Sequence, residues 1–292
     1  MMFRIIRRRW LTLFLFIFLP IMAVAQSEPS PEVACTGWLD MVSRTQENQP
    51  HWATPLATVT ARLEQEFRYD QYSQMQGNGS SIENFGGGKG LELIPTYNTE
   101  VILGIPPYQE ETVRGRTSYG LGDWSPLLVK YRILSQNETS GDYILTGFFQ
   151  VVMPTGTTGL SNGLYLLQPT IAFGKGWGDF DIQATLSEQF PVGSMNAVDS
   201  QSAFGNPILA NMTFQYHLAS LLLWPELEVN YEFWPSGTHQ GLTQVLLTPG
   251  VVVGRIPISG RVNLIFGVGY QVAVTADPVV NNNLDLTARL TF

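Results

Sequence analysis

Acidic side chains at every second position are the residues of this sequence best placed to do chemistry. Glu226, Glu228 and Glu232 alternate with apolar residues such as Leu227 and Tyr231. In an extended strand, this spacing puts the carboxylates on one face and the apolar side chains on the other. A charge on the lipid side of a membrane strand costs up to about 4 kcal/mol near the midplane. We therefore expect these carboxylates to face a polar interior, where they could contact a solute or form ion pairs.

Charged residues with the same spacing recur in other segments and are also expected to face a lumen. Two roles remain open for them: a paired network that holds a barrel shut, or a path along which a solute binds. The predicted lumen-lining residues are Arg62, Glu64, Glu66, Arg68, Lys130, Arg132, His217, Glu226, Glu228, Glu232, Arg261 and Arg289.

Metal and cofactor chemistry receive little support from the sequence. Asp179 with Asp181, or Glu110 with Glu111, could touch calcium, but two carboxylates in a loop are more often simply solvated. Residues 86–90 superficially resemble a phosphate-binding loop, yet they lack its spacing and its following helix. We expect no metal, no cofactor and no catalytic residue.

The last nine residues indicate the kind of element that positions these charges. Residues 284–292 alternate apolar and polar side chains without interruption and end on Phe292. An edge strand of a soluble sandwich would share this period, but so would a strand of a membrane barrel. The ending resembles the signal by which bacterial outer-membrane barrels are recognised for insertion. We expect Phe292 to be an assembly signal at the periplasmic rim.

The first 25 residues have the three parts of a secretory signal peptide. Four arginines precede an apolar run from Trp10 to Ile21, and small residues follow it up to Ala25, where we expect cleavage. The run is shorter than the roughly 20 apolar residues that a membrane helix needs, and Pro20 interrupts it. No other segment is long enough for such a helix. The mature chain is therefore expected to enter a membrane only as a closed barrel.

Composition narrows the possible partners. Removing four arginines from 16 basic and 24 acidic residues leaves 12 against 24, a net charge of about −12 for the mature chain. Nucleic acid is therefore an unexpected partner, because phosphate binding needs clustered lysine and arginine. The single cysteine, Cys35, cannot form an internal disulfide and is expected to be a free thiol. Residues 26–58 show no sustained period and are expected to form a periplasmic leader or a plug-like segment.

Residues 59–292 are expected to form the barrel. Alternating segments of about ten residues, separated by turn-forming residues, predict twelve strands, an even number as such barrels require. Short links alternate with long ones, which are expected to be external loops at 70–89, 109–119, 154–163, 190–207, 234–243 and 273–283. The predicted strands are 61–69, 90–96, 101–108, 120–134, 143–153, 164–175, 180–189, 208–219, 221–233, 244–255, 259–272 and 284–292.

The fold class that follows is all-β: a transmembrane up-and-down antiparallel β-barrel of about 12 strands, preceded by a short irregular N-terminal segment. We expect the last strand to close on the first. Aromatic girdles at the two membrane interfaces are expected to include Trp124, Trp177, Trp224 and Trp234.

Three short motifs resemble those of a known family. Residues 120–124 (GLGDW) lead into 128–132 (LVKYR), and the next predicted strand ends in 151–156 (VVMPTG). This pattern is similar to the outer-membrane transporter-like family known as the MetA-pathway of phenol degradation family, over roughly residues 61–292. The resemblance implies a barrel of about twelve strands that passes small, often aromatic or hydrophobic, molecules. It implies no catalytic residues, and the family's name does not identify the solute.

A lipid hydrolase is the enzymatic alternative. Outer-membrane phospholipase A is a barrel of this size that uses a serine, a histidine and an asparagine. Its motif would place a histidine two residues before Ser-Asn-Gly; residues 161–163 have that sequence, but Gly159 occupies the histidine position. Of the three histidines, His51 precedes the barrel, His217 is on the predicted lumen face and His239 is in a loop. A serine without a base is inert at neutral pH, which disfavours hydrolysis.

The function expected from the sequence is an outer-membrane channel or transporter-like barrel that passes small molecules by diffusion through a mixed-charge lumen. The alternative is a non-conducting structural or surface-binding barrel, because a twelve-strand barrel is narrow enough for side chains to close. The expected partners are outer-membrane lipids, the barrel-assembly machinery and an unidentified small solute. The expected location is the bacterial outer membrane, with both barrel ends of the chain at the periplasmic side.

Overall fold

The computed structural model describes residues 37–87, 89–194, 204–219 and 222–292. Trp38–Phe292 forms one compact unit, and the fold below is that of this unit. The expected signal peptide at residues 1–25 and the first part of the predicted leader, residues 26–36, lie outside the described residues.

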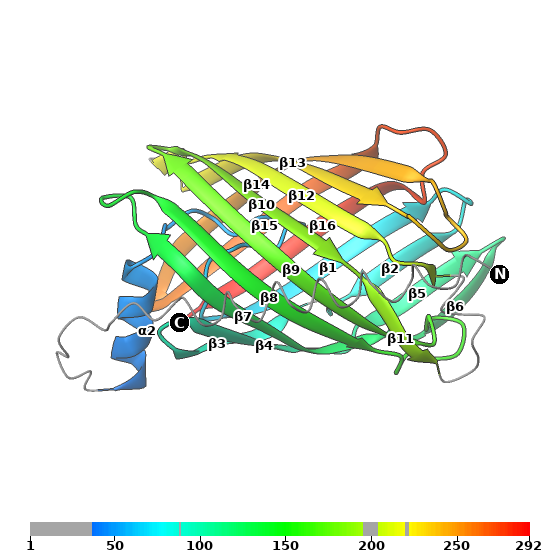
Figure 1. Cartoon of the computed structure of the whole chain (residues 1–292), viewed down its shortest axis with the longest axis horizontal. Coiled ribbons are helices and arrows are strands. Elements are labelled where there is room, and N and C mark those ends of the chain that lie inside the picture. The colour runs from blue at the N-terminus through cyan, green and yellow to red at the C-terminus, as the bar shows by residue number, and fades with distance from the viewer. Residues whose placement is uncertain (1–36, 88, 195–203, 220–221) are drawn as a thin grey trace, which may run out of the picture. The chain divides into compact units, whose positions relative to one another are not determined.

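Twelve antiparallel strands form a closed ring, as the sequence predicted (Figure 1). Neighbours in the ring are neighbours along the chain, and β16 returns to pair with β1, so no edge is left open. Closure gives every ring strand two partners for its backbone amides, which a lipid environment requires. The ring consists of β1 (Glu66–Gln76), β3 (Gly90–Thr96), β4 (Thr99–Gly104), β7 (Trp124–Gln136), β8 (Tyr143–Met153), β9 (Leu164–Trp177), β10 (Phe180–Glu188), β12 (Ile208–Tyr216), β13 (Leu223–Phe233), β14 (Thr243–Ser259), β15 (Val262–Ala273) and β16 (Val280–Thr291).

Four shorter strands lengthen the wall at one end. Strand β2 (Ser81–Phe85) pairs with β1 beyond β3, and β5 (Tyr108–Val113) and β6 (Arg116–Leu121) continue outward from β2, while β11 (Phe190–Ser194) pairs with β9. The predicted loops at 70–89 and 109–119 are therefore wrong, because both are mostly strand. Polar residues stand on both faces of these segments, so the alternation that marks a lipid-facing strand is absent from them.

The closing pair differs from the prediction in its first member. The last strand pairs with the first, as expected, with Arg289 opposite Arg68 and Asp285 opposite Tyr72. However, β1 begins at Glu66, whereas the sequence predicted a strand from residue 61. Residues 61–65 are buried but lie outside the sheet, because several of their backbone groups bind side chains of the lumen wall.

We call the end of the barrel where β1 begins and β16 ends the near end, and the opposite one the far end. The link between β3 and β4 and that between β14 and β15, both at the near end, consist of two residues each. At the far end, the link between β8 and β9 has ten residues. The short helix α2 (Trp38–Glu47) lies at the near end (Figure 1), where Trp38 Nε1 donates to the carbonyl of Ile94 at 2.7 Å. Within the described ranges, no helix is long and apolar enough to cross a membrane.

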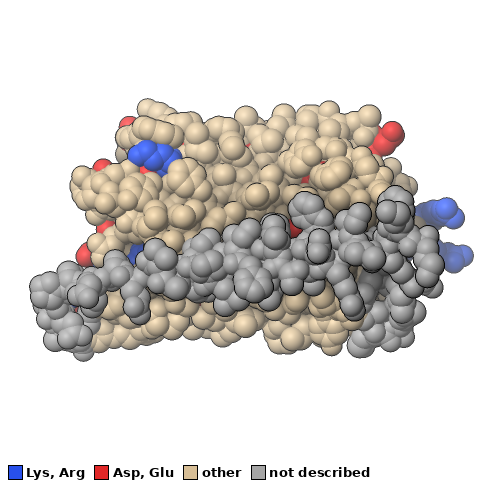
Figure 2. Space-filling model, viewed as in Figure 1, with Lys and Arg blue, Asp and Glu red and all other residues tan. Residues whose placement is uncertain are grey.

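The outer surface of the wall is apolar. Large side chains on the outward positions of the strands are 36–57% exposed, among them Phe149, Leu186 and Tyr270. On the face drawn in Figure 2, charged side chains gather mainly toward the two ends, as a lipid-facing band requires. The girdle prediction is wrong for Trp224 and Trp234, which are 4% and 6% exposed, because these two rings turn away from the outer surface.

Candidate functional site

The predicted lumen-lining residues are mostly where the sequence placed them, on the inward face. Of the twelve, His217 and Glu232 are half-buried and Arg261 is exposed. The remaining nine are less than 7% exposed: Arg62, Glu64, Glu66, Arg68, Lys130, Arg132, Glu226, Glu228 and Arg289.

Arg261 is a correction to that set. It lies in the turn between β14 and β15 at the near end, where its guanidinium donates to the carbonyl of Leu39 in α2 at 2.8 Å. The predicted strand began at residue 259, whereas β15 begins at Val262. Gly260 has φ +55° and reverses the chain before Arg261, which is therefore outside the strand.

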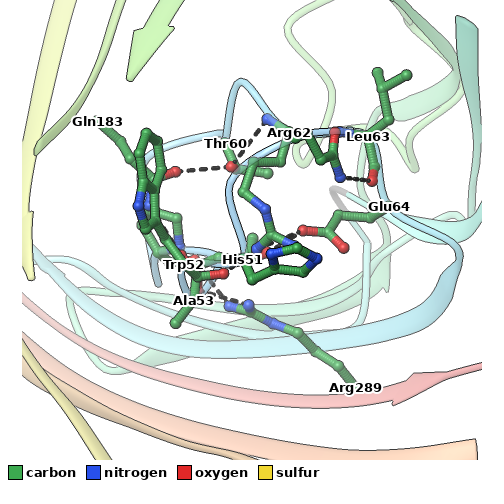
Figure 3. Close-up of polar contacts among 12 residues, drawn as sticks. His51, Trp52, Ala53, Thr60, Arg62, Leu63, Glu64, Gln183 and Arg289 are labelled. Carbon is green, nitrogen blue, oxygen red and sulfur yellow. Dashed lines mark hydrogen bonds and ion pairs between the residues drawn. The ribbon is translucent and has the colours of Figure 1, made fainter. Parts of the chain in front are cut away.

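Arg62 and Glu64 are lumen residues, but they do not belong to a wall strand. They belong to residues 49–65, which we call the inner segment and which run inside the barrel before β1 begins. The two side chains form an ion pair at 3.1 Å, and Arg62 also donates to the carbonyl of Trp52 in the same segment (Figure 3). Thr54 Oγ1 donates to Glu64 at 2.9 Å. These charges therefore fold the inner segment onto itself.

Two wall glutamates accept hydrogen bonds from the main chain of the inner segment. Glu226 Oε1 accepts from the amide of Leu56 at 3.1 Å. Glu228 accepts from the amides of Ala57 and Thr58 at 2.7 and 2.6 Å. Glu226 and Glu228 of the predicted lumen wall thus bind three consecutive backbone N–H groups of the inner segment. Without these carboxylates, the donors would be buried without a partner.

Arginines from β1 and β16 bind the carbonyls of the same stretch. Arg289 donates to the carbonyls of Thr54 and Pro55 at 2.6 and 2.8 Å, and Arg68 donates to that of Leu56 at 2.7 Å. The guanidinium fork matches two successive carbonyl oxygens because its donors have a fixed geometry. The inner segment therefore has its N–H groups bound by β13 and its C=O groups by β1 and β16.

A third contact is made by an ion pair between two wall residues, both of which are fully buried. Lys130 Nζ lies 3.0 Å from Glu100 Oε1, and both side chains are 0% exposed. The lysine also donates to the carbonyl of Arg62 at 3.2 Å, and Glu100 accepts from the amide of Glu64 at 2.6 Å. Both members of the ion pair thus also bind the main chain of the inner segment, and these bonds add to the stability of the buried pair.

Apolar side chains of the inner segment fit positions where the wall has only glycine. Trp52 packs against Ile144 and Ala172, and Leu56 packs against Trp224 and Val252. A Cβ atom added at Gly174 would overlap the Trp52 ring. Added Cβ atoms at Gly250, Gly267 and Gly269 would lie 2.5–2.7 Å from the Leu56 methyl groups. These distances are too short for two carbons, so the wall is shaped for this segment.

The near end closes over the inner segment. Arg132 donates to the carbonyl of Thr45 in α2 at 2.8 Å. His51 lies at the entrance, where its ring and its amide both bind the carboxylate of Glu138 in the turn between β7 and β8, at 2.9 and 2.5 Å. Partial burial disfavours the charged form of Glu138, but these hydrogen bonds outweigh burial and lower its pKa.

The sequence missed some residues that matter for this arrangement. Glu100, Arg255 and Gln183 all bind the inner segment; Arg255 donates to the carbonyl of His51 at 2.7 Å, and Gln183 to that of Ala53 at 2.9 Å. The period of two predicted the inward position of Gln183 only, because Glu100 fell in a predicted link and Arg255, which has outward parity, turns inward at a bulge of β14 where its φ is +57°. The partners of all three residues were not predicted. The inward glycines carried no signal, because only the folded position of Leu56 explains why a side chain is excluded there.

The histidine rings bear on the hydrolase hypothesis. His217 stacks on Trp224 with ring centroids 4.1 Å apart, His239 lies against Trp234 at 5.5 Å, and His51 binds Glu138. Two histidines are thus held by aromatic rings and the third by a carboxylate, an arrangement that does not prepare a serine for attack.

The fold is that of the outer-membrane β-barrels, and solved structures of that class are similar to this chain. An outer-membrane channel from Pseudomonas putida F1 matches 77% of this chain and 93% of its own, with a TM-score of 0.50 and 13% sequence identity. The NanC porin matches 77% of this chain and 98% of its own at 8% identity, with a TM-score of 0.45. No protein-family model and no curated protein sequence matches the chain. At such identities, the likeness concerns the fold alone.

Proposed function

We propose that this chain is an outer-membrane channel for small molecules in which the inner segment, residues 49–65, is a plug that controls conduction. The observation that carries the proposal is that the charged lumen wall binds the main chain of the segment. Glu226, Glu228, Arg68 and Arg289 would otherwise face the lumen as a path for solutes. In the structure they bind the main chain of the inner segment instead.

The orientation proposed puts the near end in the periplasm. Short turns are typical of the periplasmic end of such barrels and longer loops of the external end. The two-residue links lie at the near end, together with α2. A plug anchored there could be pulled by a periplasmic partner that binds the chain before residue 49.

The plug is held by hydrogen bonds to charged wall residues and by apolar packing. A hydrogen bond to a charged group is worth about 1.5–3 kcal/mol net. Three such bonds to Glu226 and Glu228, and three to Arg68 and Arg289, offset part of the entropy cost of ordering the segment, and the burial of Trp52 and Leu56 adds to them. Loss of one carboxylate should therefore shift the equilibrium measurably toward an open lumen.

The experiment is single-channel recording of the refolded full chain and of a Glu226→Gln, Glu228→Gln variant. The variant keeps the size of both side chains but removes both charges, so we expect the frequency of opening to rise by about tenfold or more. Leu227→Ala, on the lipid side of the same strand, is the matched control and should behave as the full chain does.

The rival function is a non-conducting structural or surface-binding barrel. The close fit of Leu56 into the glycine positions of β14 and β15 favours a plug that never leaves. If neither the full chain nor the double variant conducts at any voltage, the rival function is the correct one. If the full chain conducts freely and the variant is no different, the barrel is a channel but the inner segment does not control it.

The solute is a separate question. The aromatic or hydrophobic preference implied by the family resemblance stays a prediction, and conductance alone does not test it.

A further inference from the structure

Carboxamide side chains face each other across the strands of the far half of the lumen. Asn211 lies opposite Asn230 on β12 and β13, and Gln150 lies opposite Gln168 on β8 and β9. All four have the inward parity of their strands: Asn230 follows Glu226 and Glu228 on the same face. The plug is bound at the near half by charges, whereas the far half is lined by amides.

Hydrogen bonds connect these amides across four strands. Asn230 donates to Asn211 Oδ1 at 3.1 Å, and its own Oδ1 accepts from Thr248 at 3.3 Å and from Gln271 at 2.9 Å. On β9, which β10 separates from β12, Gln168 accepts from Gln189 at 2.9 Å. Each carboxamide has two N–H donors and two acceptor lone pairs, so the network orients the amides and leaves donors and acceptors for a further partner.

Solvent reaches this part of the lumen. Inward residues of the near half such as Glu228, Thr213 and Thr146 are 0% exposed. Farther along the same strands, Asn211, Asn230 and Gln150 are half-buried. These side chains point away from the lipid, and the surface they expose therefore faces the lumen. The far half is thus accessible to a solute while the plug is in place.

Basic side chains are missing from the amide-lined side of the far half. Strands β8, β9, β10, β12, β13 and β15 contain a single lysine or arginine, Lys175, which lies at the near end of β9. The far-end links at 154–163, 190–207, 234–243 and 273–283 contain no lysine or arginine at all. Two carboxylates, Glu232 and Asp285, are half-buried on the inward face. The other two far-end segments, 70–89 and 109–119, contain Lys89, Arg114 and Arg116. In the far half of β8 to β15, where the amides lie, an anion would find hydrogen-bond donors but no positive charge.

We propose that the far half of the lumen is a binding site for uncharged, hydroxyl-rich solutes, that is, short saccharides, and that it rejects anions. A sugar hydroxyl both donates and accepts, as a carboxamide does, so a row of amides can bind successive hydroxyls without a charge on either side. Tyr72, half-buried on the inward face of β1, adds an apolar ring surface beside Gln109. This proposal rests on the proposed channel function in one respect only: that function explains why a solute should enter the lumen.

The test is equilibrium binding to the refolded full chain in a zwitterionic detergent without a sugar headgroup, measured by calorimetry. The probes are maltotriose, trigalacturonate, spermidine and phenol. We expect saturable binding of maltotriose, and binding of trigalacturonate weaker by about tenfold or more, because it brings three charges to a site with two carboxylates. Tighter binding of trigalacturonate, or of spermidine or phenol than of maltotriose, would overturn the proposal.

Two variants locate the site. Asn230→Leu removes the central amide of the network and should weaken maltotriose binding by about fivefold or more. Gln150→Leu makes the same change on the other side of the barrel, should Asn230→Leu fail to fold. Tyr231→Leu, the lipid-facing neighbour of Asn230, is the control and should bind as the full chain does. Equal affinity in all three variants would show that maltotriose binds elsewhere.

This readout is independent of conduction. Binding occurs above the closed plug and needs no current, so maltotriose binding in a barrel that never conducts would refute the channel and keep the saccharide site. Conduction without maltotriose binding would do the reverse.

Discussion

Single charged residues in this barrel bind backbone groups as well as opposite charges. Arg289 shows this best: it is 1% exposed and directs its two terminal nitrogens at the carbonyls of Thr54 and Pro55. A buried guanidinium needs several acceptors to offset the loss of water, and the inner segment supplies them. The wall and the segment therefore satisfy each other's buried polar groups.

Replacing Arg289 by lysine should loosen the plug while keeping the charge. An ammonium is a point charge and cannot bind two carbonyls as the planar fork does. We expect amide hydrogen exchange of residues 54–58 to become faster by about tenfold, with the strands of the barrel unaffected. Arg132→Lys, at the near end, is the comparison and should leave that stretch protected. Unchanged exchange in Arg289→Lys would show that the fork contributes little.

Acid should weaken the closure of the near end. Hydrogen bonds from His51 hold the pKa of Glu138 below its ordinary value, against the effect of burial. A carboxylate whose pKa is lower in the folded than in the unfolded state stabilises the fold at pH values above its unfolded pKa. This contribution is lost as the pH falls through the pKa of the folded state. We expect the full chain to melt at a higher temperature than Glu138→Gln at neutral pH, and the difference to vanish in acid. A difference that is constant with pH would contradict this.

At the scale of elements, glycine positions on β14 and β15 shape the wall for one side chain of the plug. A Cβ atom at Gly250 would lie 2.5 Å from Leu56 Cδ1. Gly250→Ala should therefore displace the plug at a cost of about 1–3 kcal/mol and raise conduction. Adding Leu56→Ala should restore closure in part, whereas Val251→Ala on the other face should have no effect. Independent, additive effects of the two substitutions would show that they do not touch.

The sequence predicted those elements that lie between lipid and lumen. Strands β3 and β8 have the predicted bounds, and the inward faces of β12 and β13 are correct to the residue, because one side must be apolar there. Strands β5 and β6 were missed because no lipid imposes an alternation on them. Arg62 and Glu64 were assigned to a strand because an extended segment that binds side chains has the same period as one in a sheet.

The sequence predicted the charged residues of the candidate site but not the segment that they bind. Alternation placed Glu226, Glu228 and Arg289 in the lumen, but pairing and solute binding remained equally open. The partner is the main chain of the inner segment, and backbone groups carry no sequence signal. Only the fold brings residues 49–65 to those charges.

At the scale of the whole molecule, closure of the ring pairs the first strand of the barrel with the last. Strand β16 pairs with β1 along its length, and the amide of Phe292 donates to the carbonyl of Gln65, just where the plug ends. Deleting Phe292 should lower the assembled fraction in cells without much effect on the melting of the refolded barrel, since the role predicted for it is recognition. Phe292→Tyr keeps an aromatic ring and should assemble normally. Normal assembly of the deletion would refute that role.

The central claim is that the inner segment closes the lumen by staying in it. The most direct test is to fix it there, with Leu56→Cys and Gly250→Cys joined by a short thiol-specific crosslinker in a chain carrying Cys35→Ser. Single-channel current is then recorded before and after the crosslinker is cleaved. The account predicts no openings while the crosslink is intact and openings once it is cleaved. The same current in both states would contradict it.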